Sequence, residues 1–127
     1  MIISTIDRTS STRQGGEEIR WRSLARRGML HSECDSVDYV RLSPGTEFAL
    51  RGREGTESAW FVLAGSGLLR EQGSEAGERT LDAGELVLLP AGADARITSG
   101  ADGLELLWLV VMPRSISQSL PMRRPVA

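Results

Sequence analysis

This chain of 127 residues has little of the chemistry on which many protein sites depend. All 15 of its basic residues are arginines, and the absence of lysine excludes a Schiff-base lysine and a phosphate-loop lysine. The chain contains one histidine, His31, and one cysteine, Cys34, so no disulfide can form within it. A zinc site of the Cys/His type needs at least three protein ligands, and these two residues do not supply them.

A strong net charge and long apolar runs are also missing. The formal net charge is -2, whereas nucleic-acid binding usually depends on a basic field. Residues 106–112 form the longest apolar run, which is far too short to span a bilayer, and residues 1–10 are polar, unlike a secretory signal. We therefore expect a soluble cytoplasmic protein that binds neither nucleic acid nor membranes.

Composition divides the chain into three parts within the length of a single domain. Residues 1–18 are polar and predict a flexible N-terminal lead-in, residues 19–112 predict the folded domain, and residues 113–127 predict an extended C-terminal tail with three prolines. Both ends are basic and the part between them is acidic. Such ends either lie on the protein's own acidic surface and in solvent, or contact an anionic partner.

Short strands separated by turns are predicted between residues 29 and 112. Turn signals recur about every 8–12 residues, which favours an all-β sandwich or barrel. Glycine and proline mark the expected turns, at residues 43–45, 64–67, 83–84, 90–92 and 100–103. Residues 17–27 fit either a strand or a helix, and the alternation of Ile19 and Trp21 with charged residues favours a strand.

Two strands are predicted to be covered on both faces. Residues 86–89 read LVLL and residues 104–111 read LELLWLVV, and such continuous apolar runs are typical of strands with no solvent-facing side. One face would look into the interior of the domain, and the other would meet a second sheet or another subunit. We therefore expect a homodimer.

The spacing of two motifs resembles that of a known family. The order Gly45, Arg51, Arg53, Ser58 and Gly65 is similar to the first motif of the cupin superfamily. The order Gly84, Pro90, Gly92, Ala95 and Ser99 is similar to the second motif. The resemblance spans residues 29–112 and implies an all-β fold, the double-stranded β-helix or jelly-roll cupin barrel, for the domain at residues 19–112.

The metal ligands of the family are replaced in this chain. The resemblance implies His, His and Glu at positions 51, 53 and 58 and His at position 95, where this sequence has Arg51, Arg53, Ser58 and Ala95. Two of the replacements are cations, which would repel a divalent metal ion. We therefore expect no metal site and no cofactor, and the family's metal-dependent dioxygenase and decarboxylase activities are not carried over.

The same positions predict a ligand site inside the barrel. Because side chains alternate along a strand, Ser58 and Trp60 share the face of the lost Glu, and Ala95, Ile97 and Ser99 share the face of the lost His. Two guanidiniums beside an indole would suit a small anionic or aromatic metabolite. Tyr39 and Arg41 share a face of the preceding strand and are placed at the same mouth. The expected ligand-binding residues are Arg41, Arg51, Arg53, Ser58, Trp60, Ala95, Ile97 and Ser99.

Plainer interpretations of these residues stay open. Arg51 and Arg53 also fit a solvated charged turn, paired with Glu54 and Glu57, and Trp60 also fits a core position. Whether the protein is an enzyme is open as well. One hypothesis is a metal-free isomerase, cyclase or dehydratase of bacterial small-molecule biosynthesis, with His31 and Tyr39 as weak candidates for base and acid, as in metal-independent relatives of the sugar-epimerase type.

Two other hypotheses involve no catalysis. In one, the barrel captures a small metabolite as a binding or regulatory module, which predicts saturable stabilisation by a ligand. In the other, the barrel is filled by Trp60 and the arginines and the chain acts only as a dimer or partner surface, which predicts no sizeable pocket at the mouth.

Overall fold

A computed structural model describes residues 3–7, 9–26, 34–50, 56–72 and 77–112 and shows an all-β protein. Within these residues there is no helix, and so none of the length and apolar character needed to cross a membrane. The strands are β1 (Ser10–Gln14), β2 (Glu17–Arg26), β3 (Cys34–Leu42), β4 (Glu47–Leu50), β5 (Glu57–Glu71), β6 (Glu78–Asp82), β7 (Leu86–Leu89) and β8 (Ala95–Val111).

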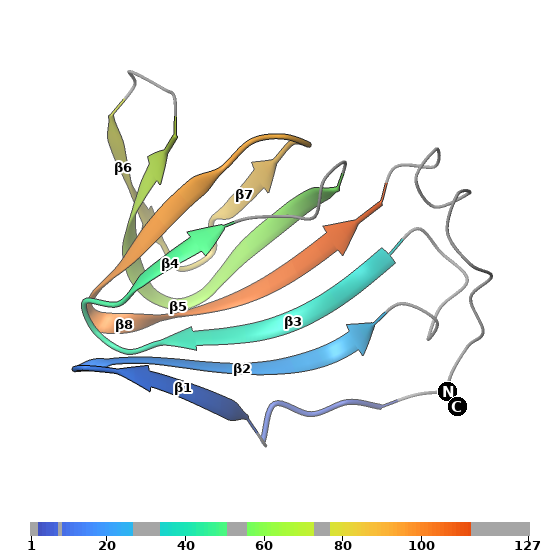
Figure 1. Cartoon of the computed structure of the whole chain (residues 1–127), viewed down its shortest axis with the longest axis horizontal. Coiled ribbons are helices and arrows are strands. Elements are labelled where there is room, and N and C mark those ends of the chain that lie inside the picture. Colours follow the sequence, from blue (N-terminus) through green and yellow to red (C-terminus); the bar gives the residue numbers. More distant parts are fainter. Residues whose placement is uncertain (1–2, 8, 27–33, 51–55, 73–76, 113–127) are drawn as a thin grey trace.

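Two long antiparallel strands, β5 and β8, organise the fold. They pair with each other along their length, and each belongs to two layers. One layer has the order β1-β2-β3-β8-β5-β7, and the other has the order β4-β8-β5-β6. Figure 1 shows both strands curving from one layer into the other. This is the jelly-roll barrel that the resemblance of the two motifs implies, and its all-β class is the one that the spacing of strands and turns predicts.

The glycines at 64–67 and 100–103 bend strands and do not reverse them. We expected turns there, but β5 and β8 continue through both segments. Gly65 and Gly103 have φ of 80° and 76°, and a Cβ on Gly65 would overlap the carbonyl oxygen of Gly103. Glycine is therefore required where the two strands bend together. The turns predicted around Gly45, Gly84 and Gly92 are confirmed, each with a positive φ.

The sheet begins before the boundary that the sequence suggested. We expected residues 1–18 to be a flexible lead-in, but β1 pairs with β2, from Ser10 opposite Trp21 to Gln14 opposite Glu17. Every residue of β1 is exposed, so its polar sequence carries no hydrophobic alternation from which a strand could be predicted. The strand predicted for residues 17–27 is confirmed by β2. The expected tail at 113–127 lies outside the described residues.

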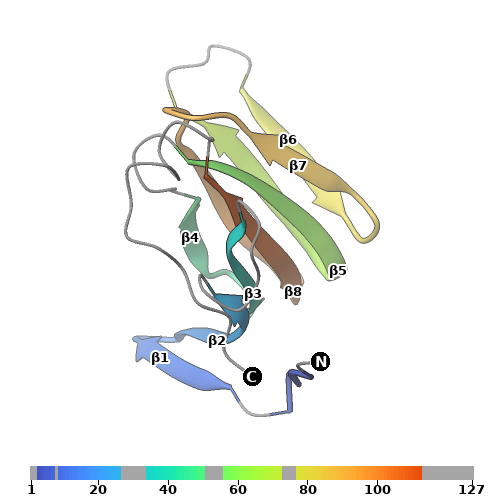
Figure 2. The same ribbon diagram turned by 90° about the vertical axis from the view of Figure 1, so that its right-hand side faces the viewer.

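The hydrophobic core lies between the two layers. It is built from alternate residues of the long strands and their neighbours: Val40, Leu42, Leu50, Trp60, Val62, Leu81, Leu89, Ala95, Ile97, Leu104 and Leu106. The β1–β2 end of the sheet lies far from β6 and β7 (Figures 1 and 2), and Trp21 of β2 is 46% exposed. On β7, Leu89 is buried while Leu86 and Leu88 are exposed, so the described part of the chain leaves the outer face of this strand uncovered.

Candidate functional site

The inner face of the larger layer carries a row of polar and aromatic side chains. In the strand ladders, Asp38 of β3 lies opposite Trp108 of β8, and Trp108 lies opposite Trp60 of β5. The two indoles stack with ring centroids 4.4 Å apart and an interplanar angle of 15°. Phe48, from β4 of the other layer, meets their rings edge-on at 5.8 Å and 6.4 Å. Aromatic packing therefore fixes the distance between the layers at this point.

The two stacked indoles differ in their hydrogen bonding. Nε1 of Trp60 donates to Oγ of Ser58 at 3.0 Å. Nε1 of Trp108 is buried and has no hydrogen-bond partner, and the same is true of Oδ1 of Asp38. Buried polar atoms without partners are uncommon in folded proteins because leaving them unpaired costs free energy. The inner face therefore holds one unused donor and one unused acceptor on facing residues.

The environment of Asp38 disfavours its charged form. Burial raises the pKa of this carboxyl above its usual value, and the nearby charge of Asp35 acts in the same direction. A hydrogen bond from Ser23, directly opposite on β2, lowers the pKa and only partly offsets the effect of burial. A carboxyl held in this way is expected to gain from a ligand that donates to its remaining oxygen.

Five of the predicted site residues lie on the inner faces of the two layers: Ser58 and Trp60 on β5, and Ala95, Ile97 and Ser99 on β8. All five are buried, as the alternation along each strand predicts. Trp60, Ala95 and Ile97 belong to the hydrophobic core. The Ser99 hydroxyl accepts from the backbone N–H of Thr46 at 2.9 Å and donates to the carbonyl of Ser43 at 2.5 Å, so it anchors the turn before β4.

The prediction that Tyr39 and Arg41 line the same mouth is wrong. Their neighbours Val40 and Leu42 point into the core, so alternation turns Tyr39 and Arg41 to the outer face of β3. The Tyr39 hydroxyl donates to the Glu105 carboxylate, and burial together with this hydrogen bond raises its pKa to about 12. Tyr39 therefore faces away from the inner residues and keeps its proton at neutral pH.

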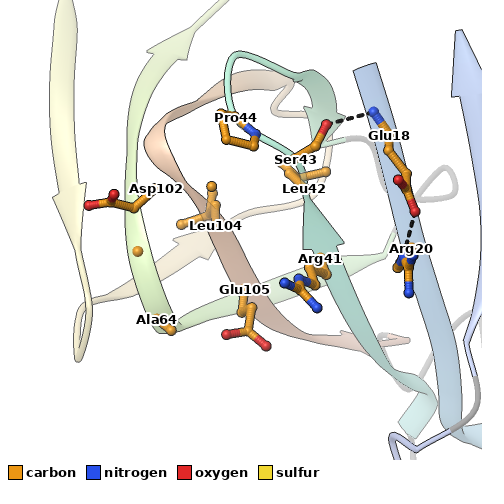
Figure 3. Close-up of a pocket in the computed structure, with 12 residues that line it drawn as sticks. Glu18, Arg20, Arg41, Leu42, Ser43, Pro44, Ala64, Asp102, Leu104 and Glu105 are labelled. Atoms are coloured by element: carbon orange, nitrogen blue, oxygen red, sulfur yellow. Dashed lines mark hydrogen bonds and ion pairs between the residues drawn. The ribbon is translucent and has the colours of Figure 1, made fainter. Parts of the chain in front are cut away.

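Arg41 instead lines a separate pocket of about 250 Å³ on the outer side of the sheet. Figure 3 shows its side chain beside that of Glu105, the residue opposite it on β8. Arg20 and Glu18 of β2 also line this pocket and form an ion pair with each other. Side chains of both charges line it, including Asp102, so the pocket does not select for an anion.

The remaining predicted residues, Arg51, Arg53 and His31, lie outside the described residues. Two inner residues that the sequence analysis did not single out are Asp38 and Trp108. The signal was present, because Asp38 stands two residues from Val40 and Trp108 stands two from Leu106, both of which are core positions. Because every second residue of a strand lies on the same face, counting from these two core residues places both on the inner face.

The residues at the expected metal positions do not fit a metal ion. Position 58 carries a hydroxyl that already accepts from Trp60, and position 95 carries a methyl group with no ligand atom. Across the described ranges, no three His, Cys, Asp or Glu side chains gather into a metal-binding group. Divalent metal ions in proteins are held by imidazole, thiolate and carboxylate ligands, which this inner face does not assemble.

No protein-family model matches the chain. The chain is 24% identical over 109 residues to the oxalate-binding protein of Thermotoga maritima, a match that covers 85% of this chain and 88% of that protein.

Two solved structures share its fold. A predicted oxalate decarboxylase from Thermotoga maritima matches with a TM-score of 0.70 at 19% identity, over 89% of this chain and 100% of that one. A Cupin 2 conserved barrel domain protein from Salinispora arenicola matches with a TM-score of 0.70 at 18% identity, over 94% of each chain. At these identities the likeness establishes the fold, which is the one that the motif spacing implied.

Proposed function

Since this chain has the cupin fold, we propose that it binds a small carboxylate-bearing metabolite between its two layers, without a divalent metal ion. The observation that carries the proposal is the inner face near Ser58, where two indoles stack and where Asp38 and Trp108 each present an unpaired polar atom. Cavities inside barrels are favoured ligand sites, and a few polar groups on an otherwise apolar wall give them specificity.

The carboxylate is proposed from two further observations. The sequence places Arg51 and Arg53 at the positions of two family histidines, and guanidiniums bind carboxylates through paired hydrogen bonds. The relative in Thermotoga maritima is named as an oxalate-binding protein. Binding without turnover is favoured over isomerase, cyclase or dehydratase activity because Tyr39, the expected acid, faces away from this interior.

The proposal predicts stabilisation by small carboxylates in the presence of a chelator. With EDTA present, we expect at least one of oxalate, oxamate and glycolate to raise the melting temperature of the protein in a saturable way. A ligand at 100 times its Kd adds about 2.7 kcal/mol to the free energy of unfolding. Differential scanning fluorimetry measures the effect, and ethylenediamine, a cation of similar size, is the control. A shift that EDTA abolishes and Mn²⁺ restores would contradict metal-free binding, and the absence of any shift would contradict the proposed function.

We also propose that two copies of the chain pair through the outer face of β7, β5 and β8. Leu86 is 56%, Leu88 is 70% and Phe61 is 38% exposed there, and a hollow of about 310 Å³ lined in part by Ala59 and Val111 adjoins them. Contiguous exposed apolar side chains of this kind are typical of protein interfaces.

Charge complementarity favours a second copy as the occupant. Glu57 lies at one end of this face and Arg41 lies near the other, because β3 and β5 both pair with β8. A two-fold axis running across the strands would bring Glu57 of one copy towards Arg41 of the other. Such self-complementarity is what a symmetric dimer requires.

A charge placed on this face is expected to separate the two copies. Light scattering coupled to size-exclusion chromatography should give twice the chain mass of 13.8 kDa for the unchanged protein and the single mass for Leu88→Glu. Leu68→Glu is the matched control, since Leu68 is also exposed, at 39%, but lies on the part of β5 that pairs with β6. A mass of 13.8 kDa for the unchanged protein would rule out the proposed dimer.

A further inference from the structure

Among the residues that the structure describes, the inner face holds two buried hydrogen-bonding atoms without a partner. Oδ1 of Asp38 and Nε1 of Trp108 are both without a partner. The neighbouring indole is satisfied, since Nε1 of Trp60 donates to Oγ of Ser58 at 3.0 Å. On the inner face the deficit therefore falls on one facing pair of β3 and β8, while the third such atom among the described residues, Nε of Arg22, lies on the outer face, opposite Tyr39.

The pair is close enough for one small chemical group to reach both residues. Asp38 and Trp108 are directly opposite in an antiparallel ladder, where Cβ atoms lie about 4.5–5.5 Å apart. Trp108 is held in place by its stack on Trp60, which is almost completely buried. The position of the donor is thus fixed before any ligand arrives.

The chemistry of the two atoms is complementary. An indole N–H can only donate, and a carboxylate oxygen can only accept. A group that satisfies both must accept from Trp108 and donate to Asp38. A hydroxyl or an amide does this, whereas a second carboxylate would bring two like charges together and leave Asp38 without a donor.

Building on the proposed function, we infer that the ligand carries, beside its carboxylate, an uncharged hydroxyl or amide that accepts a hydrogen bond from Trp108 and donates one to Asp38. The ligand class is therefore a hydroxycarboxylate or an amidocarboxylate, and not a plain dicarboxylate. Oxalate and oxamate test this directly, because they have nearly the same size and shape and differ in one carboxylate against one amide.

Isothermal titration calorimetry on the full chain, in the presence of EDTA, measures the preference. We expect oxamate to bind at least about tenfold more tightly than oxalate, as the gain or loss of one buried hydrogen bond implies. Asp38→Asn supplies an amide donor in place of the charge, so it should reduce this ratio to about threefold or less. Trp108→Phe keeps the stacked ring and loses the N–H, so it should weaken both compounds by a similar factor. Trp21→Phe, on an exposed indole, is the control and should change neither.

The outcomes separate this inference from the function on which it rests. If oxalate binds as tightly as oxamate to the unchanged protein, the ligand class is wrong while small-carboxylate binding stands. If oxamate is preferred but Asp38→Asn leaves the ratio unchanged, a different residue sets the preference and the assignment to Asp38 fails. If neither these two compounds nor glycolate binds, the proposed function fails together with the inference. Circular dichroism and the melting temperature of each variant show whether it has folded.

Discussion

Replacing Gly65 with alanine is expected to lower the free energy of unfolding by about 3–5 kcal/mol. Gly65 has a φ of 80°, a conformation that alanine adopts only at a cost of about 1–2 kcal/mol. The added methyl group would also overlap the carbonyl oxygen of Gly103 on the facing strand. That obstacle is backbone and cannot rotate aside, so the bend that carries β5 and β8 between the layers must open. Urea denaturation followed by circular dichroism measures the change.

Two other glycines separate the sources of this loss. Gly45 also has a positive φ, of 72°, but a Cβ there meets no atom within 4 Å, so Gly45→Ala should cost only about 1–2 kcal/mol. Gly16 has neither a φ in the left-handed region nor a close neighbour, so Gly16→Ala should be nearly neutral. If Gly65→Ala costs no more than Gly45→Ala, the two strands do not approach each other at Gly65 as closely as described.

Replacing Trp60 with alanine is the second large perturbation, with an expected loss of about 3–5 kcal/mol in the free energy of unfolding. Trp60 is 1% exposed and contacts the rings of Trp108 and Phe48, so it joins the two layers through one side chain. The alanine variant would leave a cavity at the centre of the core. The midpoint of urea denaturation, with the slope of the transition as a check on cooperativity, measures the effect.

Trp60→Phe isolates the hydrogen bond from the packing. It keeps an aromatic ring between the layers and removes the donor to Ser58. The free energy of unfolding should therefore fall by only about 1–2 kcal/mol, which is the cost of leaving a buried hydroxyl without its hydrogen bond. Trp21→Ala, on an indole that is 46% exposed, should cost less than about 1 kcal/mol. Equal losses for Trp60→Ala and Trp21→Ala would mean that Trp60 is not the link between the layers.

Local sequence patterns determined much of the fold. The alternation of side chains along a strand placed Ser58, Trp60, Ala95, Ile97 and Ser99 on inner faces, and all five are buried. This worked because the face on which a strand residue lies depends on its immediate neighbours. The glycine and proline signals at 43–45, 83–84 and 90–92 were interpreted correctly because a tight turn needs a special backbone conformation wherever it occurs.

The tertiary structure decided matters that no local pattern encodes. A glycine-rich segment looks the same whether the chain reverses or a strand bends, and only the continuous pairing of β5 with β8 shows that 64–67 and 100–103 are bends. Likewise, alternation put Tyr39 and Arg41 on one face but did not say which face is the inner one. The packing of Val40 and Leu42 into the core turned Tyr39 and Arg41 outward.

By itself, the sequence determined an all-β fold and which residues share a face of each strand, because strand alternation and turn chemistry are properties of adjacent residues. The jelly-roll barrel was implied by the resemblance of its two motifs to a known family. Only the folded chain decided that Asp38 faces Trp108 and that one polar atom of each has no partner among the described residues. Strand register and burial arise between segments distant in sequence. Hydrogen-bonding atoms become unsatisfied only when the second layer closes over them and removes water.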